Sequence, residues 1–262
     1  MIILKLGGSL ITDKSKRFVI RKEAVERVAK EIEESGVLQS GLVIVHGGGS
    51  FGHPVAKEYG LDGGLIGPAQ IQGVAATRSA MTKLNTYLVE VLVGRSIPAV
   101  SVQTSAVVFC KAGRIERFDF RFIKKLLTSG LVPILYGDVV VDSELRFSIL
   151  SGDQIVSYLS RSLNPDRIIL ATDVDGVFDM DPKEARGSKA RLIPVLTYQE
   201  FASIDFGERN DATGGIKGKL VELLTLAQDG HEAYIINALR RDRLKKALSG
   251  IEVKGTRVGV LK

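Results

Sequence analysis

The sequence predicts an α/β protein, an αβα sandwich with a mostly parallel central sheet. Two observations predict this fold class. Short apolar runs alternate along the chain with longer segments whose apolar residues recur at helical spacing, and glycine-bearing turns stand at several of the junctions. Strands that alternate with helices form parallel sheets, because a parallel neighbour is reached through a crossover connection, usually a helix.

The first part of the chain contains most of the predicted elements. Ile2–Leu6 is predicted as a strand, and Arg21–Glu34 as an amphipathic helix with apolar residues at helical spacing. The further predicted elements are, in order, the strand Leu42–Val45, the helix Ile71–Val93, the strand Ala99–Val102, the helix Phe120–Leu127, the strand Val132–Leu135 and a hairpin of Val139–Val141 and Arg146–Ile149. Residues 62–68 are rich in glycine and are predicted as a mobile loop.

The second part begins near Asn164-Pro165, where a helix must end because proline disfavours helical backbone in the residue before it. No flexible linker marks this point, so we expect two lobes, residues 1–165 and 166–262, on one continuous sheet. The predicted elements around it are the helix Asp153–Leu163, the strand Arg167–Leu170, the helix Ile216–Gln228, the strand Ala233–Ile236 and the strand Arg257–Leu261.

Composition and charge exclude several classes of partner. The 262 residues carry a formal net charge of +6, but the basic residues are spread along the chain, do not interleave with aromatics and are accompanied by no tryptophan. This pattern disfavours nucleic acid and favours a small polyanionic substrate. No segment approaches the ~20 apolar residues that a membrane span needs.

The N-terminus and the cysteine content indicate a cytoplasmic protein. The chain enters an apolar run at once, without a basic leader or a small-residue cleavage site, so we expect no export signal. Cys110 is the single cysteine, which excludes an intrachain disulfide and fits a reducing compartment. We interpret Cys110 as a small buried hydrophobe rather than a nucleophile.

Two glycine-rich turns follow the first two predicted strands. In Lys5-Leu6-Gly7-Gly8-Ser9 the glycines let the backbone approach a phosphate, with Lys5 and Lys14 as nearby charges. Taken alone, this segment is better explained as a tight turn beside two solvated lysines. The second turn, His46–His53, contains three consecutive glycines, whose cost in chain entropy is explained by backbone N–H donors around an anion. It also matches G-x-G-x-x-G, but the second strand and acidic residue of a dinucleotide site do not follow, which argues against a dehydrogenase.

Two further turns carry charged residues. Ser151-Gly152-Asp153 opens a predicted helix, either as an ordinary N-cap or with Asp153 orienting lysines by ion pairing. The segment 213–219, which contains Lys217 and Lys219, differs from a Walker A loop in its glycine spacing and lacks the Ser/Thr. Between these turns, an acidic segment over 171–178 follows a predicted strand, where ligands of α/β sheets bind.

The order and spacing of these turns, from Lys5 to Lys219, resemble the amino acid kinase superfamily. This resemblance implies an αβα sandwich in which residues 1–165 bind the phosphoryl acceptor and residues 166–262 bind ATP. Within the superfamily, the segment His46–His53 resembles the isopentenyl phosphate kinase family, which transfers the γ-phosphoryl of ATP to isopentenyl phosphate in isoprenoid biosynthesis by the mevalonate pathway. Fosfomycin kinases share the second histidine and are the alternative; other superfamily phosphotransferases and a non-catalytic oxyanion-binding domain are further possibilities.

The resemblance also implies roles for individual residues. The implied phosphate-binding and catalytic residues are Lys5, Lys14, Gly8 and Lys219, with Lys217 as a further candidate. Gly48, Gly49 and His53 match the acceptor-phosphate site, and Gly152 and Asp153 match the turn that contacts substrate and organises the lysines. Thr172, Asp173, Asp175, Gly176 and Lys183 match the nucleoside region.

Cofactors and partners follow from the same resemblance. ATP enters with Mg²⁺, which bridges its oxygens, and we expect no metal site built from protein side chains. A homodimer is implied as well. The five-carbon tail of isopentenyl phosphate needs an apolar pocket, for which we predict Ala76 and Ala80 on one helix face and Ile149 before the third turn.

Overall fold

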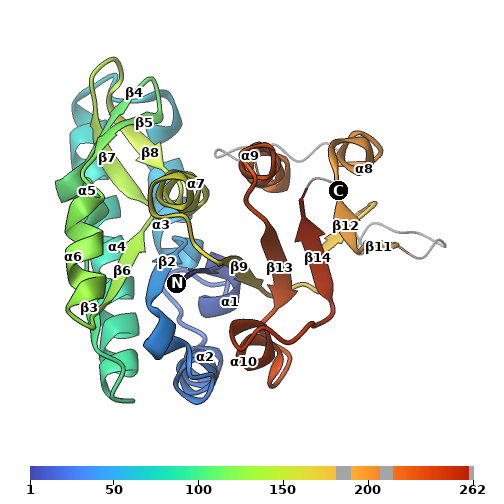
Figure 1. Cartoon of the computed structure of the whole chain (residues 1–262). Helices are drawn as coiled ribbons and strands as arrows, with labels where there is room; N and C mark the ends of the chain where they lie inside the picture. The colour runs from blue at the N-terminus through green and yellow to red at the C-terminus, as the bar shows by residue number, and fades with distance from the viewer. Residues whose placement is uncertain (181–189, 207–214, 260–262) are drawn as a thin grey trace.

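The computed structural model describes residues 1–180, 190–206 and 215–259, and it is built around one eight-stranded sheet (Figure 1). All neighbouring strands run parallel except the β13–β14 pair. The strand order is β12 (Val195–Leu196), β14 (Gly255–Val258), β13 (Ala233–Asn237), β9 (Arg167–Thr172), β1 (Ile2–Leu6), β2 (Leu42–His46), β6 (Val132–Tyr136) and β3 (Ala99–Ser101). The predicted α/β class with a mostly parallel sheet is confirmed.

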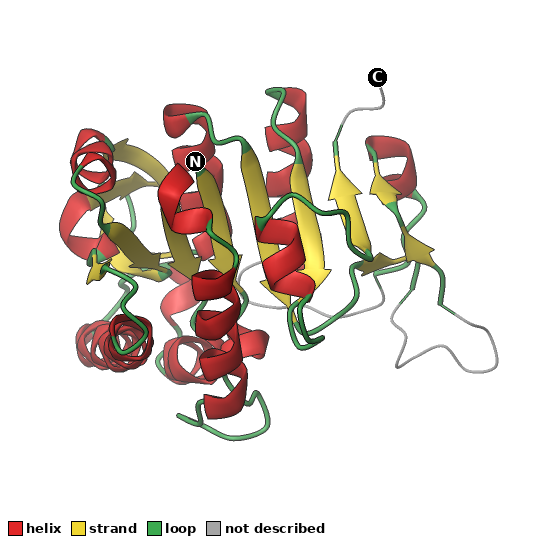
Figure 2. Ribbon diagram, turned by 60° about the horizontal axis from the view of Figure 1, so that its bottom comes forward, coloured by secondary structure: helices red, strands yellow, loops and turns green. Residues whose placement is uncertain are grey.

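Helices cover both faces of this sheet (Figures 1 and 2). One face packs against α1 (Gly8–Ile11), α2 (Lys22–Glu34), α3 (Gly49–Glu58), α4 (Pro68–Val93) and α10 (Arg243–Leu248). The other face packs against α6 (Arg121–Thr128), α7 (Gly152–Leu163) and α9 (Gly215–Gln228). Each face buries its own apolar core.

The alternation of side chains along β1 assigns its residues to the two cores. Ile2, Leu4 and Leu6 lie in the core beneath α2 and α4, whereas Ile3 lies in the core beneath α7 and α9. Because successive side chains of a strand point to opposite faces, Lys5 shares the face of Ile3. The position of Lys5 at the carboxyl end of β1 therefore directs it toward α7.

Smaller elements complete the fold. A four-stranded sheet has the order β5 (Arg114–Phe118), β4 (Val108–Lys111), β7 (Asp138–Asp142) and β8 (Arg146–Leu150). The remaining elements are a ribbon of β10 (Val177–Phe178) and β11 (Leu192–Ile193), the helices α5 (Thr104–Val107) and α8 (Tyr198–Ala202), and the 3₁₀ turns η1 (Val37–Ser40) and η2 (Leu61–Gly63). No helix in the described ranges combines the length and apolar character that a membrane crossing requires.

The structure differs from the sequence prediction in several elements. Helix α3 was not predicted, because its first turn contains Gly49 and Gly52, which are poor helix formers, and Pro54 lies inside it. Its packing against α4 overrides this weak propensity. The sequence also did not predict the strands β4, β5, β10, β11 and β12 or the short helices α1, α5, α8 and α10. The predicted last strand begins earlier, as β14, and residues 260–262 lie outside the described part. Part of segment 62–68 bonds to the β7–β8 hairpin, where Leu65 N donates to Leu145 O (3.1 Å).

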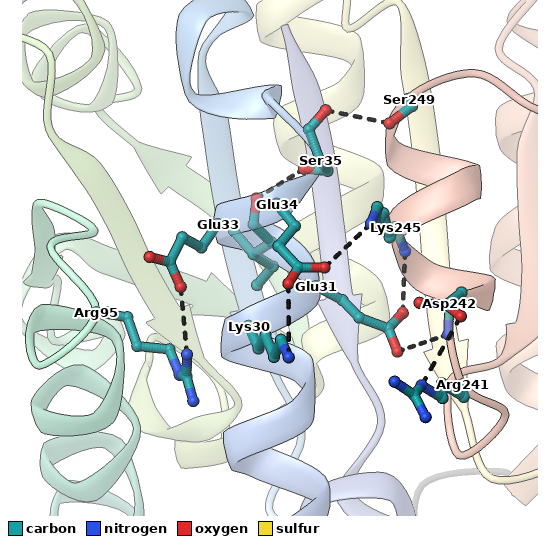
Figure 3. Close-up of polar contacts among 11 residues, drawn as sticks. Lys30, Glu31, Glu33, Glu34, Ser35, Arg95, Arg241, Asp242, Lys245 and Ser249 are labelled. Carbon is teal, nitrogen blue, oxygen red and sulfur yellow. Dashed lines mark hydrogen bonds and ion pairs between the residues drawn. The ribbon is translucent and has the colours of Figure 1, made fainter.

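A buried carboxylate joins the two parts of the chain (Figure 3). Glu31 of α2 is 3% exposed. Its Oε1 accepts a hydrogen bond from Asp242 N (2.9 Å) and its Oε2 accepts one from Lys245 N (3.0 Å). The first N–H groups of a helix have no partner inside the helix. Glu31, from residues 1–165, therefore caps helix α10, which belongs to residues 166–262. The ion pair between Glu34 and Lys245 (3.1 Å) joins the same two helices.

We predict that Glu31→Ala lowers the free energy of unfolding by about 2 kcal/mol, because it leaves two backbone donors without their charged acceptor. Chemical denaturation followed by circular dichroism measures this change. The matched control is Glu33→Ala on the same helix, whose exposed ion pair with Arg95 (3.2 Å) contributes little. Equal losses in the two variants would contradict the capping role of Glu31.

Candidate active site

The turns after β1 and β2 touch each other at the carboxyl end of the sheet. A Cβ atom at Gly8 would lie 2.4 Å from the backbone nitrogen of Gly49. Gly49 has a φ of +48°, and a Cβ there would lie 2.1 Å from Thr12 Oγ1. The Thr12 hydroxyl joins the turns, donating to Gly8 O (2.7 Å) and accepting from Ser50 N (2.9 Å). Close approach therefore requires these glycines, independently of the N–H donors predicted from the sequence.

The first turn of α3 lies directly on α4. A Cβ at Gly48 would lie 3.1 Å from Met81 Sδ, and a Cβ at Gly52 would lie 2.8 Å from it. Met81 is 1% exposed, so this contact is part of the core. Met81 could not be singled out from the sequence, because one methionine on an apolar helix face is ordinary core composition. This contact determines how closely α3 packs on α4, and hence where His53 lies.

A buried ion pair lies next to these turns. The Lys5 ammonium contacts the Asp153 carboxylate at the N-terminus of α7, and both side chains are largely shielded from solvent. A Cβ at Gly152 would lie 3.3 Å from Lys5 Cε, so the small residue leaves room for the lysine. Burial lowers the pKa of Lys5 from 10.5 to about 8, although Asp153 acts in the opposite direction, and the positive charge of Lys219 lowers it further.

The charge on Asp153 is stabilised from three other elements. Burial alone would raise the pKa of the Asp153 carboxyl, but the positive charges of Lys5, Lys219 and His53 hold that pKa below its ordinary value. These groups come from β1, α9 and α3. The structure thus brings four of the predicted residues into electrostatic contact at one edge of the sheet, where the cations outnumber the single carboxylate. Such an arrangement attracts a polyanion.

The two candidate lysines of helix α9 have different neighbours. Lys217 Nζ lies 5.9 Å from the ring centroid of Phe206, whereas Lys219 acts electrostatically on Lys5 and Asp153. Residues two apart on a helix do not share a face, so α9 directs Lys219, and not Lys217, toward the ion pair. Lys14 is exposed in the loop between β1 and α2. Lys183, predicted for the nucleoside region, lies outside the described residues.

The turn after β9 is held by its own contacts. Ser9 Oγ donates a hydrogen bond to Asp173 Oδ1 (2.5 Å), which joins this turn to the turn after β1. Thr172 is buried. Gly176 has a φ of +148°, and a Cβ there would lie 2.5 Å from Thr256 Oγ1, so only glycine fits.

Asp175 is already paired within the protein. Its carboxylate contacts Arg243 Nη1 (2.7 Å), Lys254 Nζ (3.0 Å) and Asn237 Nδ2 (3.0 Å). Burial alone would raise the pKa of Asp175, but these partners lower it to about 2. The three partners could not be found from the sequence, because they are more than 60 residues from Asp175 in the chain. Only the folded sheet brings them to the same edge.

The two histidines of the second turn have different environments. His46 is fully buried, its ring stacks on Tyr136 with centroids 5.3 Å apart, and its Nε2 lies 3.2 Å from Asn85 Nδ2. Burial lowers the pKa of His46 to about 4, so this histidine is neutral at physiological pH. His46 therefore contributes hydrogen bonds rather than charge. His53 is exposed in α3 and acts on Asp153.

The predicted residues of the apolar tail pocket divide between two clusters. Ala80 is buried in the core beneath α2 and α4, and Ala76 packs against that core. Ile149 packs against a separate cluster of Ala56, Leu61, Val74 and Val139. The described residues do not join the three predicted side chains in one apolar cluster.

Neither a protein-bound metal nor a cysteine nucleophile is indicated by the described residues. Within the ranges that the structure describes, no group of three or more His, Cys, Asp or Glu side chains is arranged to hold a metal ion. Cys110 is 1% exposed, and burial raises the pKa of its thiol to about 11. A thiol in this state is a poor nucleophile, in agreement with its interpretation as a buried hydrophobe.

Comparison with known proteins identifies the family. The model of the amino acid kinase family matches residues 1–237. The isopentenyl phosphate kinase of Methanothermobacter thermautotrophicus is 44% identical over 98% of both chains, and that of Methanocaldococcus jannaschii is 36% identical over the same shares. A crystal structure of isopentenyl phosphate kinase superposes with a TM-score of 0.86 at 42% identity, covering 98% of this chain and 99% of the other.

This protein is therefore a member of the amino acid kinase family, as the fold and the turns at the edge of its sheet indicated. Within that family it belongs with the isopentenyl phosphate kinases, which confirms the resemblance stated for the segment His46–His53.

We predict that Lys5 titrates near pH 8, and that its partners shift this value in opposite directions. Asp153→Asn lowers the pKa of Lys5, because it removes the carboxylate that favours the ammonium; Lys219→Met raises it, because it removes a like charge. Side-chain NMR of isotopically labelled lysine measures each midpoint. Shifts of the opposite sign would contradict the arrangement.

The same titration affects stability. Because the pKa of Lys5 is lowered from 10.5 to about 8 on folding, the unfolded chain binds more protons between these two pH values. The unfavourable contribution of Lys5 to the free energy of unfolding therefore diminishes as the pH rises through this window.

Proposed function

We propose that this protein transfers the γ-phosphoryl group of ATP to isopentenyl phosphate, giving isopentenyl diphosphate and ADP. The main support is its 44% identity, over 98% of its length, to an isopentenyl phosphate kinase. The cluster of Lys5, Asp153, His53 and Lys219 supports the same chemistry, because a kinase that joins two polyanions needs converging cations.

In this proposal the residues at the edge of the sheet position the substrates and neutralise their charge. Lys5, Lys14 and Lys219 contact the ATP phosphates and the transferred phosphoryl, and Asp153 orients Lys5. His53 binds the acceptor phosphate, beside the backbone of Gly48 and Gly49 and the turn at Gly152. The acceptor is already ionised, so no general base is needed, and the rate enhancement comes from alignment and electrostatic stabilisation.

We propose that ATP binds across the first turn and the residues after β9. Gly8 lies against the nucleotide phosphates, and Thr172, Asp173, Asp175, Gly176 and Lys183 belong to the nucleoside region. Asp175 acts there by ordering the turn, because its carboxylate is held by Arg243 and Lys254. Mg²⁺ enters as part of the MgATP substrate and offsets phosphate charge. Lys217 has a secondary role, because it lies over Phe206.

The remaining assignments rest on the family. We propose that residues 1–165 carry the acceptor and residues 166–262 carry ATP, on opposite sides of the central strand β1. Ala76, Ala80 and Ile149 are proposed to bound the hydrocarbon tail, the first two from α4 and the third from β8. A homodimer in the cytoplasm fits the family and the single, buried cysteine.

A panel of acceptors tests the proposed reaction. The purified protein is incubated with ATP and Mg²⁺ and with isopentenyl phosphate, dimethylallyl phosphate, fosfomycin, glutamate, aspartate, carbamate or UMP. ADP release is measured and the product is identified by mass spectrometry. We expect turnover with isopentenyl phosphate far above that with the free amino acids. A preference for fosfomycin would support the alternative kinase, and ATP binding without transfer to any acceptor would support the oxyanion-binding alternative.

We predict that His53→Ala lowers kcat/KM for isopentenyl phosphate by ~100-fold to ~1000-fold, because it removes one charge-assisted contact to the transition state. The matched control is His231→Ala, since His231 precedes β13 at the opposite end of the sheet and its loss leaves turnover unchanged. A folded His53→Ala variant with the kinetics of the wild type would contradict the proposed binding of the acceptor phosphate by His53.

A further inference from the structure

The loop that carries Lys14 is closed at its base. This segment, residues 13–19, is here named the lysine loop. Thr12 and Ile20 form an antiparallel bridge, and Asp13 N donates to Val19 O (2.9 Å). Arg21 Nε donates to Thr12 O (3.1 Å) below the bridge. The ends of the lysine loop are therefore fixed to the body of the protein, and Lys14, which follows Asp13 directly, is exposed.

Phe18 in this loop has an unusual conformation for its residue type. Its φ is +58°, in the left-handed region, and its side chain is 48% exposed. A bulky aromatic residue in this region is strained, and such strain persists only where surrounding contacts hold it. Exposure of the ring offers no hydrophobic reason for keeping it there. The contacts of Phe18 must therefore explain its conformation.

Those contacts all lead to α3. The rings of Phe18 and Phe51 pack edge to face, with centroids 5.5 Å apart at 75°. Phe18 N donates to Ser50 O (3.3 Å). The guanidinium of Arg17 lies 5.3 Å from the Phe18 ring centroid and also pairs with Glu58 of α3 (2.8 Å).

These contacts connect two groups of the proposed reaction. Ser50 and Phe51 belong to the first turn of α3, and His53 follows them in the same helix. Phe18 lies four residues after Lys14, inside a loop whose other end is fixed at Thr12. The Phe18–Phe51 ring contact, the Phe18–Ser50 hydrogen bond and the Arg17–Glu58 ion pair thus link the helix of the proposed acceptor ligand with the loop of an ATP-side lysine.

We propose that Phe18 is a positioning residue, which docks the lysine loop on α3 and so fixes Lys14 relative to His53. The inference rests on the proposed kinase reaction, and it adds a residue that does not itself contact the substrates. Its consequence is that the position of Lys14 depends on the contact between the lysine loop and α3.

Steady-state kinetics of Phe18→Ala test this proposal. We expect kcat to fall by ~10-fold to ~100-fold, the usual effect of a misplaced catalytic group, with a much smaller change in KM for isopentenyl phosphate. Phe18→Tyr keeps the aromatic ring, and we expect its kcat to equal that of the wild type. Phe109→Ala is the matched control, because Phe109 is also exposed and also lies under an arginine, Arg117 (4.6 Å), on the separate four-stranded sheet. Unchanged kcat in Phe18→Ala would overturn the proposal.

Phe18→Gly separates docking from backbone strain. Glycine adopts a φ of +58° without strain but has no ring. We expect this variant to lose as much activity as Phe18→Ala, and wild-type activity in it would overturn the docking role.

A double-mutant cycle shows whether Phe18 acts through Lys14. If it does, Phe18→Ala produces no further loss in a Lys14→Met background, which lacks the charged group, whereas independent, multiplicative losses overturn the proposal. Limited trypsin digestion gives a readout that does not need the acceptor: Phe18→Ala should speed cleavage after Lys14, Lys16 and Arg17. Unchanged cleavage overturns the docking. Faster cleavage in a protein that does not phosphorylate isopentenyl phosphate would keep the docking and reject the proposed function instead.

Discussion

The buried ion pair between Lys5 and Asp153 is the interaction on which the arrangement of the site depends. A charge removed from water is strongly destabilising unless a partner meets it. Lys5 is placed in the interior by the alternation of β1, which leaves it on the same face as Ile3. Asp153 meets it from the first turn of α7, where the helix dipole also favours a carboxylate. The pair thereby fixes α7 against the central strand, and Lys219 and His53 add their charges around it.

A second constraint is the close contact among turns that come from different strands. Gly8 and Gly49 touch through backbone atoms, and Gly48 and Gly52 leave room for Met81. Any side chain at these positions would move α3 away from its neighbours, and with it His53. The glycines therefore serve the geometry of the site as well as any anion bound there. Helix α3 thus packs against α4 through Met81 and against the lysine loop through the ring of Phe18.

The continuous sheet and the α2–α10 contact make one body of the two parts of the chain. Strand β1 pairs with β2 on one side and with β9 on the other. Glu31 adds a polar connection at the N-terminus of α10, where its carboxylate accepts hydrogen bonds from two backbone N–H groups. A large movement between residues 1–165 and 166–262 would break these bonds together with strand pairing.

Much of this protein could be predicted from its sequence, because the signals involved are local. Apolar runs and helical spacing predicted most strands and helices, and glycine-bearing turns with nearby lysines indicated phosphate chemistry and the kinase family. Helix α3 could not be predicted, because glycines and a proline disfavour a helix and only its packing against other elements, chiefly α4, favours it. Sequence likewise left open the different states of His46 and His53 and the choice between Lys217 and Lys219. Only the tertiary structure decided these, because burial, partners and direction depend on residues that are far apart in the chain.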